Sequence, residues 1–170
     1  MRPMRFLPRD LRIALSFTFL MFLFHANSAG AKDLPSDICT LLTPQQLQKT
    51  LGQPFGAAEK STAPAAYRGQ PSGTDCQFTG QKSGSPGVRF IVYVDRSPAE
   101  AKQTFEKLSA FFPAESKPSG IGDSEYIDDD HAIHVLKGNV RFFINVSSGA
   151  SDTTREKQAQ DLAVAVAAQT

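Results

Sequence analysis

The sequence is poor in the residues and motifs that mark common enzymes and nucleic-acid-binding proteins. It has 170 residues, no tryptophan, two cysteines and three histidines. The patterns G-x-S-x-G, H-E-x-x-H, C-x-x-C and the phosphate-binding loop are all absent, so the sequence predicts no catalytic residue, no cofactor and no metal site. The 18 basic and 17 acidic residues nearly cancel and form no basic patch. We therefore expect no nucleic-acid partner.

The sequence also lacks an apolar run long enough to cross a bilayer. Its apolar run Ile13–Phe24 has 12 residues, whereas a spanning helix needs about 20. Four arginines precede this run, and Ala29 and Ala31 follow it in the A-x-A arrangement of a cleavage site. We therefore predict a secretory signal peptide over residues 1–31, a periplasmic or secreted location, and no stable membrane insertion after cleavage; an uncleaved anchor is the alternative.

The remaining residues, 32–170, have the length of a single domain. The leader holds four of the 18 basic and one of the 17 acidic residues, which leaves a net charge of 14 − 16 = −2. Cys39 and Cys76 predict one disulfide, because exported proteins fold in oxidising compartments. Two separate buried thiols are the alternative.

One strand pattern occurs twice in the chain. The segment GVRFIVYV at 87–94 is matched by NVRFFINV at 139–146. Apolar residues alternate along both segments, so each predicts a strand with one apolar face and one mixed face. Helix starts of one type, a hydroxyl residue followed by proline, occur at Thr43 and at Ser97. Together these matches predict an internal duplication, with chance similarity as the alternative.

The pattern of elements predicts an α+β fold. Helices are expected at about 43–51, 97–112 and 153–168, and strands at about 55–59, 75–79, 88–94, 124–127, 131–136 and 140–146. A Lys-Gly-Asn turn at 137–139 predicts a hairpin between the last two strands. We expect an antiparallel sheet with the helices packed on one face.

Three short motifs carry a resemblance. They are CTLLTPQQLQKTLGQP at 39–54, a second cysteine in a strand at Cys76, and SGIGDSEY at 119–126. The chain resembles uncharacterised secreted domains found among bacterial surface lipoproteins and, more distantly, the PsbP-like fold. The resemblance covers most of residues 38–170 and implies an α+β fold without a general catalytic site. The chain departs from the lipoprotein pattern because it lacks a lipid-acceptor cysteine.

The segment DDDHAIH at 128–134 is the most chemically suggestive one. Carboxylates and imidazoles are metal ligands, so a small metal-dependent or hydrolytic enzyme is one interpretation. On a strand, however, His131 and His134 would point to opposite faces because they are three residues apart. We therefore expect a solvated turn here.

A binding surface is predicted on the mixed faces of the repeated strands. It comprises Arg89, Ile91, Tyr93, Arg141, Phe143 and Asn145. Aromatic and guanidinium groups are enriched at protein interfaces. The alternative is a covered face, with Ile91 and Phe143 buried and the arginines paired with acids. Tyr67 and Arg68, in the long polar segment 60–74, form a second candidate site. The favoured function is an exported, non-catalytic domain that binds a protein or a cell-envelope component.

Overall fold

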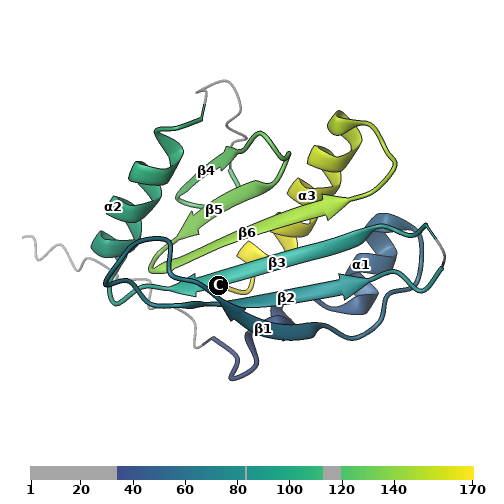
Figure 1. Cartoon of the computed structure of the whole chain (residues 1–170), viewed down its shortest axis with the longest axis horizontal. Helices are drawn as coiled ribbons and strands as arrows, with labels where there is room; N and C mark the ends of the chain where they lie inside the picture. Colours follow the sequence, from purple (N-terminus) through teal and green to yellow (C-terminus); the bar gives the residue numbers. More distant parts are fainter. Residues whose placement is uncertain (1–33, 83, 113–119) are drawn as a thin grey trace, which may run out of the picture. The chain divides into compact units, whose positions relative to one another are not determined.

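The computed structural model describes residues 34–82, 84–112 and 120–170 (Figure 1). The predicted signal peptide, residues 1–31, lies outside these ranges. Within the described residues, no helix combines the length and the apolar character needed to span a membrane.

The core of the fold is a six-stranded antiparallel sheet with the order β1-β2-β3-β6-β5-β4 (Figure 1). The strands are β1 (Glu59–Ala63), β2 (Gly73–Thr79), β3 (Gly87–Val94), β4 (Ser124–Ile127), β5 (Ile133–Lys137) and β6 (Val140–Ser147). The two repeated segments are β3 and β6, which pair with each other at the centre of the sheet. One expected strand, at 55–59, is wrong: Phe55 makes a single bridge to Gly80, and β1 begins at Glu59.

The helices begin where the sequence supplies caps. They are the 3-10 turn η1 (Ile38–Leu41) and the α-helices α1 (Pro44–Leu51), α2 (Pro98–Ser109) and α3 (Asp152–Ala167). At the start of α1, Thr43 and Gln46 form a capping box in which each side chain accepts the other's backbone N–H. Ser97 caps α2 by accepting from the Glu100 amide.

The sheet has two unlike faces, because neighbouring side chains along a strand point in opposite directions. The inner face carries Phe90 and Ile144, which belong to the main core together with Leu47 of α1 and Leu162 of α3. The outer face carries the mixed residues of β3 and β6. In Figure 1, α1 and α3 lie behind the sheet.

The predicted α+β class with an antiparallel sheet is confirmed, but the expectation that all the helices pack on one face is wrong for α2. This helix packs on the outer face, where Phe105 joins Tyr126 of β4 and Leu136 of β5 in a second apolar cluster. The apolar stripe of α2 is visible in the sequence, but both sheet faces offer apolar partners. The sequence therefore could not assign the helix to a face.

The internal duplication is not confirmed. From each edge to the centre the strands follow chain order, β1-β2-β3 from one edge and β4-β5-β6 from the other. Two three-stranded units placed side by side would give this order. The helices do not follow this symmetry, because α1 packs in the inner core and α2 in the outer cluster.

The predicted disulfide is confirmed. Cys39 and Cys76 are bonded, with their Cα atoms 5.7 Å apart. Both are buried in the main core. The bond ties η1 to β2.

Candidate functional site

The six residues of the predicted surface differ sharply in exposure. Ile91 and Arg141 are buried, Tyr93, Phe143 and Asn145 are half-buried, and Arg89 is exposed. The outer face is thus partly covered, and what remains open is two hollows rather than one flat surface.

Both arginines of this face are paired with carboxylates. Arg141 donates from Nε to Asp95 Oδ2 at 2.6 Å and from Nη2 to Asp95 Oδ1 at 3.1 Å. Arg89 donates from Nη2 to Asp75 Oδ2 at 2.8 Å, and this hydrogen bond raises the pKa of Arg89. Only 5% of the Arg141 side chain is exposed, against 51% for Arg89. Arg141 is therefore part of the packed interior, whereas Arg89 faces solvent.

A row of aromatic rings crosses the outer face. Tyr126 lies opposite His134, and His134 opposite Phe143, in the strand register. The ring centroids of Tyr126 and His134 are 4.4 Å apart, and those of His134 and Phe143 are 5.1 Å apart. Phe112, just after α2, stacks on Tyr126 at 5.0 Å. Burial raises the pKa of Tyr126 well above its ordinary value, so this phenol stays neutral.

A cavity of about 230 Å³ lies between this row and α2, and we call it the α2 cavity. Its walls are mainly aromatic and aliphatic. The lining residues are Ala66, Tyr93, Phe105, Leu108, Phe112, Tyr126, His134, Arg141, Phe142 and Phe143. Three members of the predicted surface, Tyr93, Arg141 and Phe143, thus line one apolar hollow.

The loop that carries Tyr67 lies beside the same cavity. Tyr93 donates from its hydroxyl to the Pro64 carbonyl at 3.1 Å. Gln70 donates to the Thr104 hydroxyl on α2. Ala66 lines the cavity, and Tyr67 is close enough to Tyr126 to contribute to its raised pKa. The loop of the second predicted site therefore lies against the cavity, but neither Tyr67 nor Arg68 is among its lining residues, and both are exposed.

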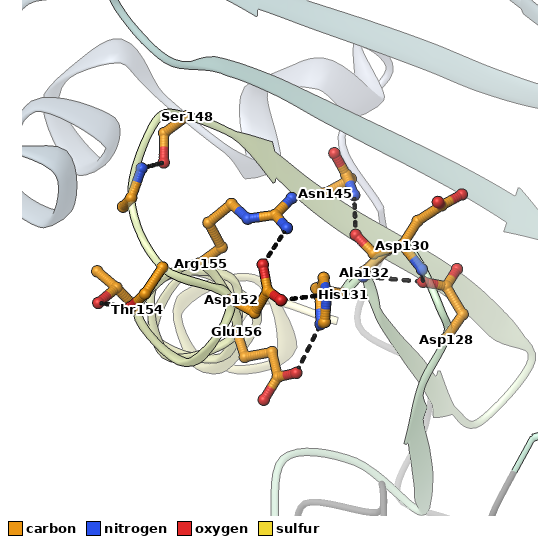
Figure 2. Close-up of polar contacts among 12 residues, drawn as sticks. Asp128, Asp130, His131, Ala132, Asn145, Ser148, Asp152, Thr154, Arg155 and Glu156 are labelled. Atoms are coloured by element: carbon orange, nitrogen blue, oxygen red, sulfur yellow. Dashed lines mark hydrogen bonds and ion pairs between the residues drawn. The ribbon is translucent and has the colours of Figure 1, made fainter.

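A second hollow, of about 330 Å³, lies on the other side of Phe143 and is polar. Its lining residues are Arg89, Asp128, Asp130, Ala132, Phe143, Asn145 and Arg155. Asn145 donates to the Asp130 carbonyl at 3.0 Å, a contact drawn in Figure 2. Phe143 therefore separates an apolar cavity from a charged one.

Asp128 and His134 form a pair between the two hollows. His134 Nε2 lies 2.8 Å from Asp128 Oδ2. Burial alone would raise the pKa of Asp128, but hydrogen bonds from His134 and from the Ala132 amide together lower it below its ordinary value. The second carboxylate oxygen accepts from the Ala132 amide at 2.9 Å, so the carboxylate also closes the β4–β5 turn.

His131 occupies this turn and points to α3 (Figure 2). Its Nδ1 lies 2.8 Å from Glu156 Oε1, and its Nε2 lies 3.2 Å from Asp152 Oδ2. The backbone φ of His131 is 61°, which is unusual for a residue other than glycine. The predicted turn is present, but the expectation that His131 lies on a strand is wrong, since β5 begins at Ile133.

The two histidines do not converge on one point. His134 binds Asp128 on the sheet, whereas His131 uses its two nitrogens for two different carboxylates. Among the residues that the structure describes, no group of three or more His, Cys, Asp or Glu side chains is placed to hold a metal ion. Both cysteines are in the disulfide. Each imidazole therefore contacts carboxylates on a different part of the chain, Asp128 for His134 and two α3 residues for His131.

Comparison with known proteins gives no match to any protein-family model or to any curated protein. Sequence reasoning missed Asp75 and Asp95 as partners of the two arginines, and it did not assign the α2 residues Phe105 and Leu108 to the site. Asp95 is 46 residues from Arg141 in sequence, and Asp75 is 14 residues from Arg89. No local spacing therefore marks either pair. Leu108 carries a visible signal, because it belongs to the apolar stripe of α2, but its partner face does not follow from that stripe.

Proposed function

We propose that this chain is an exported, non-catalytic domain that binds a protein or cell-envelope component, and that the partner docks at the α2 cavity. The observation that carries the proposal is an apolar cavity lined by aromatic rings, next to aromatic side chains that are left exposed. Tyr67 is 38% exposed, and Phe111, the neighbour of Phe112, is 78% exposed. Exposed apolar groups around a hollow mark interaction sites on soluble domains.

The composition of the site supports binding. Tyrosine, phenylalanine and arginine are the residues enriched at protein interfaces, and all three line the α2 cavity. The polar hollow beyond Phe143 gives the cavity a hydrophilic border on one side. The basic leader, the A-x-A site and the disulfide together support export.

The alternative, a small metal-dependent or hydrolytic enzyme at Asp128–His134, has weaker support. Such an enzyme needs an imidazole and carboxylates that converge on one reacting atom. Here His131 and His134 point to separate carboxylates on different elements.

Site-specific photo-crosslinking in the producing cell tests the proposal. A photoreactive phenylalanine analogue placed at Tyr67 or Phe111 should capture the same envelope species. Val164 on α3, which is 54% exposed, is the matched control position on the other side of the sheet. Equal capture from all three positions, or capture from Val164 alone, would contradict the proposal.

A further inference from the structure

We propose that the α2 cavity receives one apolar side chain of a protein partner, and that Arg141 donates a hydrogen bond to the peptide carbonyl beside that side chain. The inference rests on the proposed function and names the partner class and the contact. It is carried by the size of the cavity, the unused donors of Arg141 and the balance of charge around them.

The size of the cavity fits a single side chain. It measures about 230 Å³. A dry cavity of about 150 Å³ holds a benzene-sized molecule, and pockets for whole drug-sized ligands measure about 300–1,000 Å³. The α2 cavity therefore accommodates one aromatic ring or branched aliphatic group with a few further atoms.

Arg141 leaves donors for such a ligand. Its Nε and Nη2 bind Asp95, and among the described residues Nη1 has no hydrogen-bond partner. The side chain is 5% exposed and lines the cavity. Nη1 is not one of the buried polar atoms that lack a partner in the described residues. It is therefore accessible from the cavity and can donate to an acceptor that a ligand brings.

The charges around the cavity favour a neutral acceptor over a carboxylate. Arg141 is neutralised by Asp95, and His134 is paired with Asp128. An added carboxylate would be a third anion without a matching cation in a largely apolar site, which is unfavourable. A peptide carbonyl offers the acceptor without the charge.

The surroundings of the cavity indicate a macromolecule. Tyr67 and Phe111 remain exposed outside the hollow, so they offer contact area that a side-chain-sized molecule would leave uncovered. Protein interfaces have this anatomy, with an anchor side chain in a central pocket and a surrounding ring of contacts.

Small probes test the contact directly. The mature domain, uniformly labelled with ¹⁵N, is titrated with N-acetylphenylalanine N-methylamide, and amide and arginine Nε–H shifts are followed by NMR. Millimolar binding with shifts confined to the cavity-lining residues and the Arg141 Nε–H is expected. N-acetylphenylalanine, which carries a free carboxylate, should bind about tenfold more weakly, and N-acetylglycine N-methylamide should give no shifts. Equal or tighter binding of the carboxylate, or shifts on α1 and α3 instead, would overturn the inference.

A filled cavity tests the anchor in the full chain. Ala66→Trp places a large ring at the cavity from an exposed loop position, and Val164→Trp is the matched control on α3. The first variant should reduce probe binding and crosslinking from Phe111 by about tenfold or more, whereas the control should leave both unchanged.

The outcomes separate the two proposals. Crosslinking from Phe111 that persists in Ala66→Trp overturns the anchor but leaves the proposed function intact. Absence of crosslinking from Tyr67 and Phe111 in the unmodified background overturns the proposed function itself. A crosslinked lipid or glycan in place of a protein overturns the protein partner.

Discussion

Arg89 and Arg141 occupy the same position in two strands of similar sequence, yet they have opposite environments. Arg89 lies opposite Asn145 at one end of the β3–β6 pair, and Arg141 lies opposite Tyr93 at the other end. The first is 51% exposed and the second 5%. Each binds one aspartate, Asp75 in β2 for Arg89 and Asp95 just after β3 for Arg141.

The difference arises from what covers each end of the outer face. Helix α2 and the loop that contains Ala66 enclose the end with Arg141 and Tyr93, and the α2 cavity forms beneath them. The end with Arg89 and Asn145 stays open as the polar hollow. Arg141 is therefore buried in β6 and Arg89 is solvated in β3, although the two strands have similar sequences. Packing, and not local sequence, sets the exposure of the two side chains.

Replacement of each arginine by alanine should have the most unequal effects on the free energy of unfolding. Arg141→Ala leaves Asp95 buried without its cation and should lower the free energy of unfolding by about 3–5 kcal/mol. Arg89→Ala should cost about 1–2 kcal/mol, because water can reach the Asp75 carboxylate once the half-exposed guanidinium is gone. Chemical denaturation measures both. Equal losses would contradict the assignment of Arg141 alone to the interior.

Loss of the disulfide should weaken the half that contains β1 and β2. Cys39→Ser with Cys76→Ser should lower stability by about 2–4 kcal/mol, since the bond closes a long loop in the unfolded chain. Hydrogen exchange should speed up in η1 and β2 more than in β5 and β6. Uniform acceleration across the sheet would show that the bond does not act on one half.

The pH dependence should distinguish Asp128 from its exposed neighbour Asp129. Because the folded pKa of Asp128 is lowered, its carboxylate contributes stability above its unfolded pKa of about 3.9 that is lost as pH falls through the folded pKa. Asp128→Asn should cost about 1 kcal/mol at pH 7 and flatten the loss of stability below about pH 4. Asp129→Asn, which removes the same charge at an exposed neighbouring position, is the matched control. Superimposable profiles for Asp128→Asn and the parent would refute the assignment.

The smallest effect is expected at His131, in the turn between β4 and β5. His131→Ala and His131→Gly both remove the contacts to α3, so their difference isolates the backbone. The glycine variant should be more stable by about 1 kcal/mol, because glycine tolerates a positive φ. Thermal unfolding of the two variants checks this, and a more stable alanine variant would contradict the left-handed conformation.

Local sequence signals predicted much of the fold. The structure confirms the helix caps at Thr43 and Ser97, the strands predicted from alternation at β3 and β6, and the disulfide. Each of these was predicted from a short segment or from residue type alone. The polar strand β1 was misplaced, because an exposed edge strand has no apolar alternation: four of its five residues are exposed.

The site was predicted only in part. The alternation of residues along β3 and β6 correctly predicted that Tyr93, Arg141 and Phe143 share one face of the sheet. Backbone geometry fixes this pattern, because successive side chains of a strand point to opposite faces. It could not show that α2 crosses that face, nor that the Tyr67 loop closes over it. Both depend on contacts between residues distant in sequence, such as Gln70 with Thr104 and Phe105 with Tyr126.

Hydrogen–deuterium exchange on the bound domain tests the location of the site most directly. The mature protein is compared alone and in complex with the partner captured through Phe111. Protection is predicted in the 64–72 loop, α2 and the Phe111–Phe112 turn, with α1 and α3 unchanged. Protection confined to α1 and α3 would place the binding site on the inner side of the sheet and contradict the account.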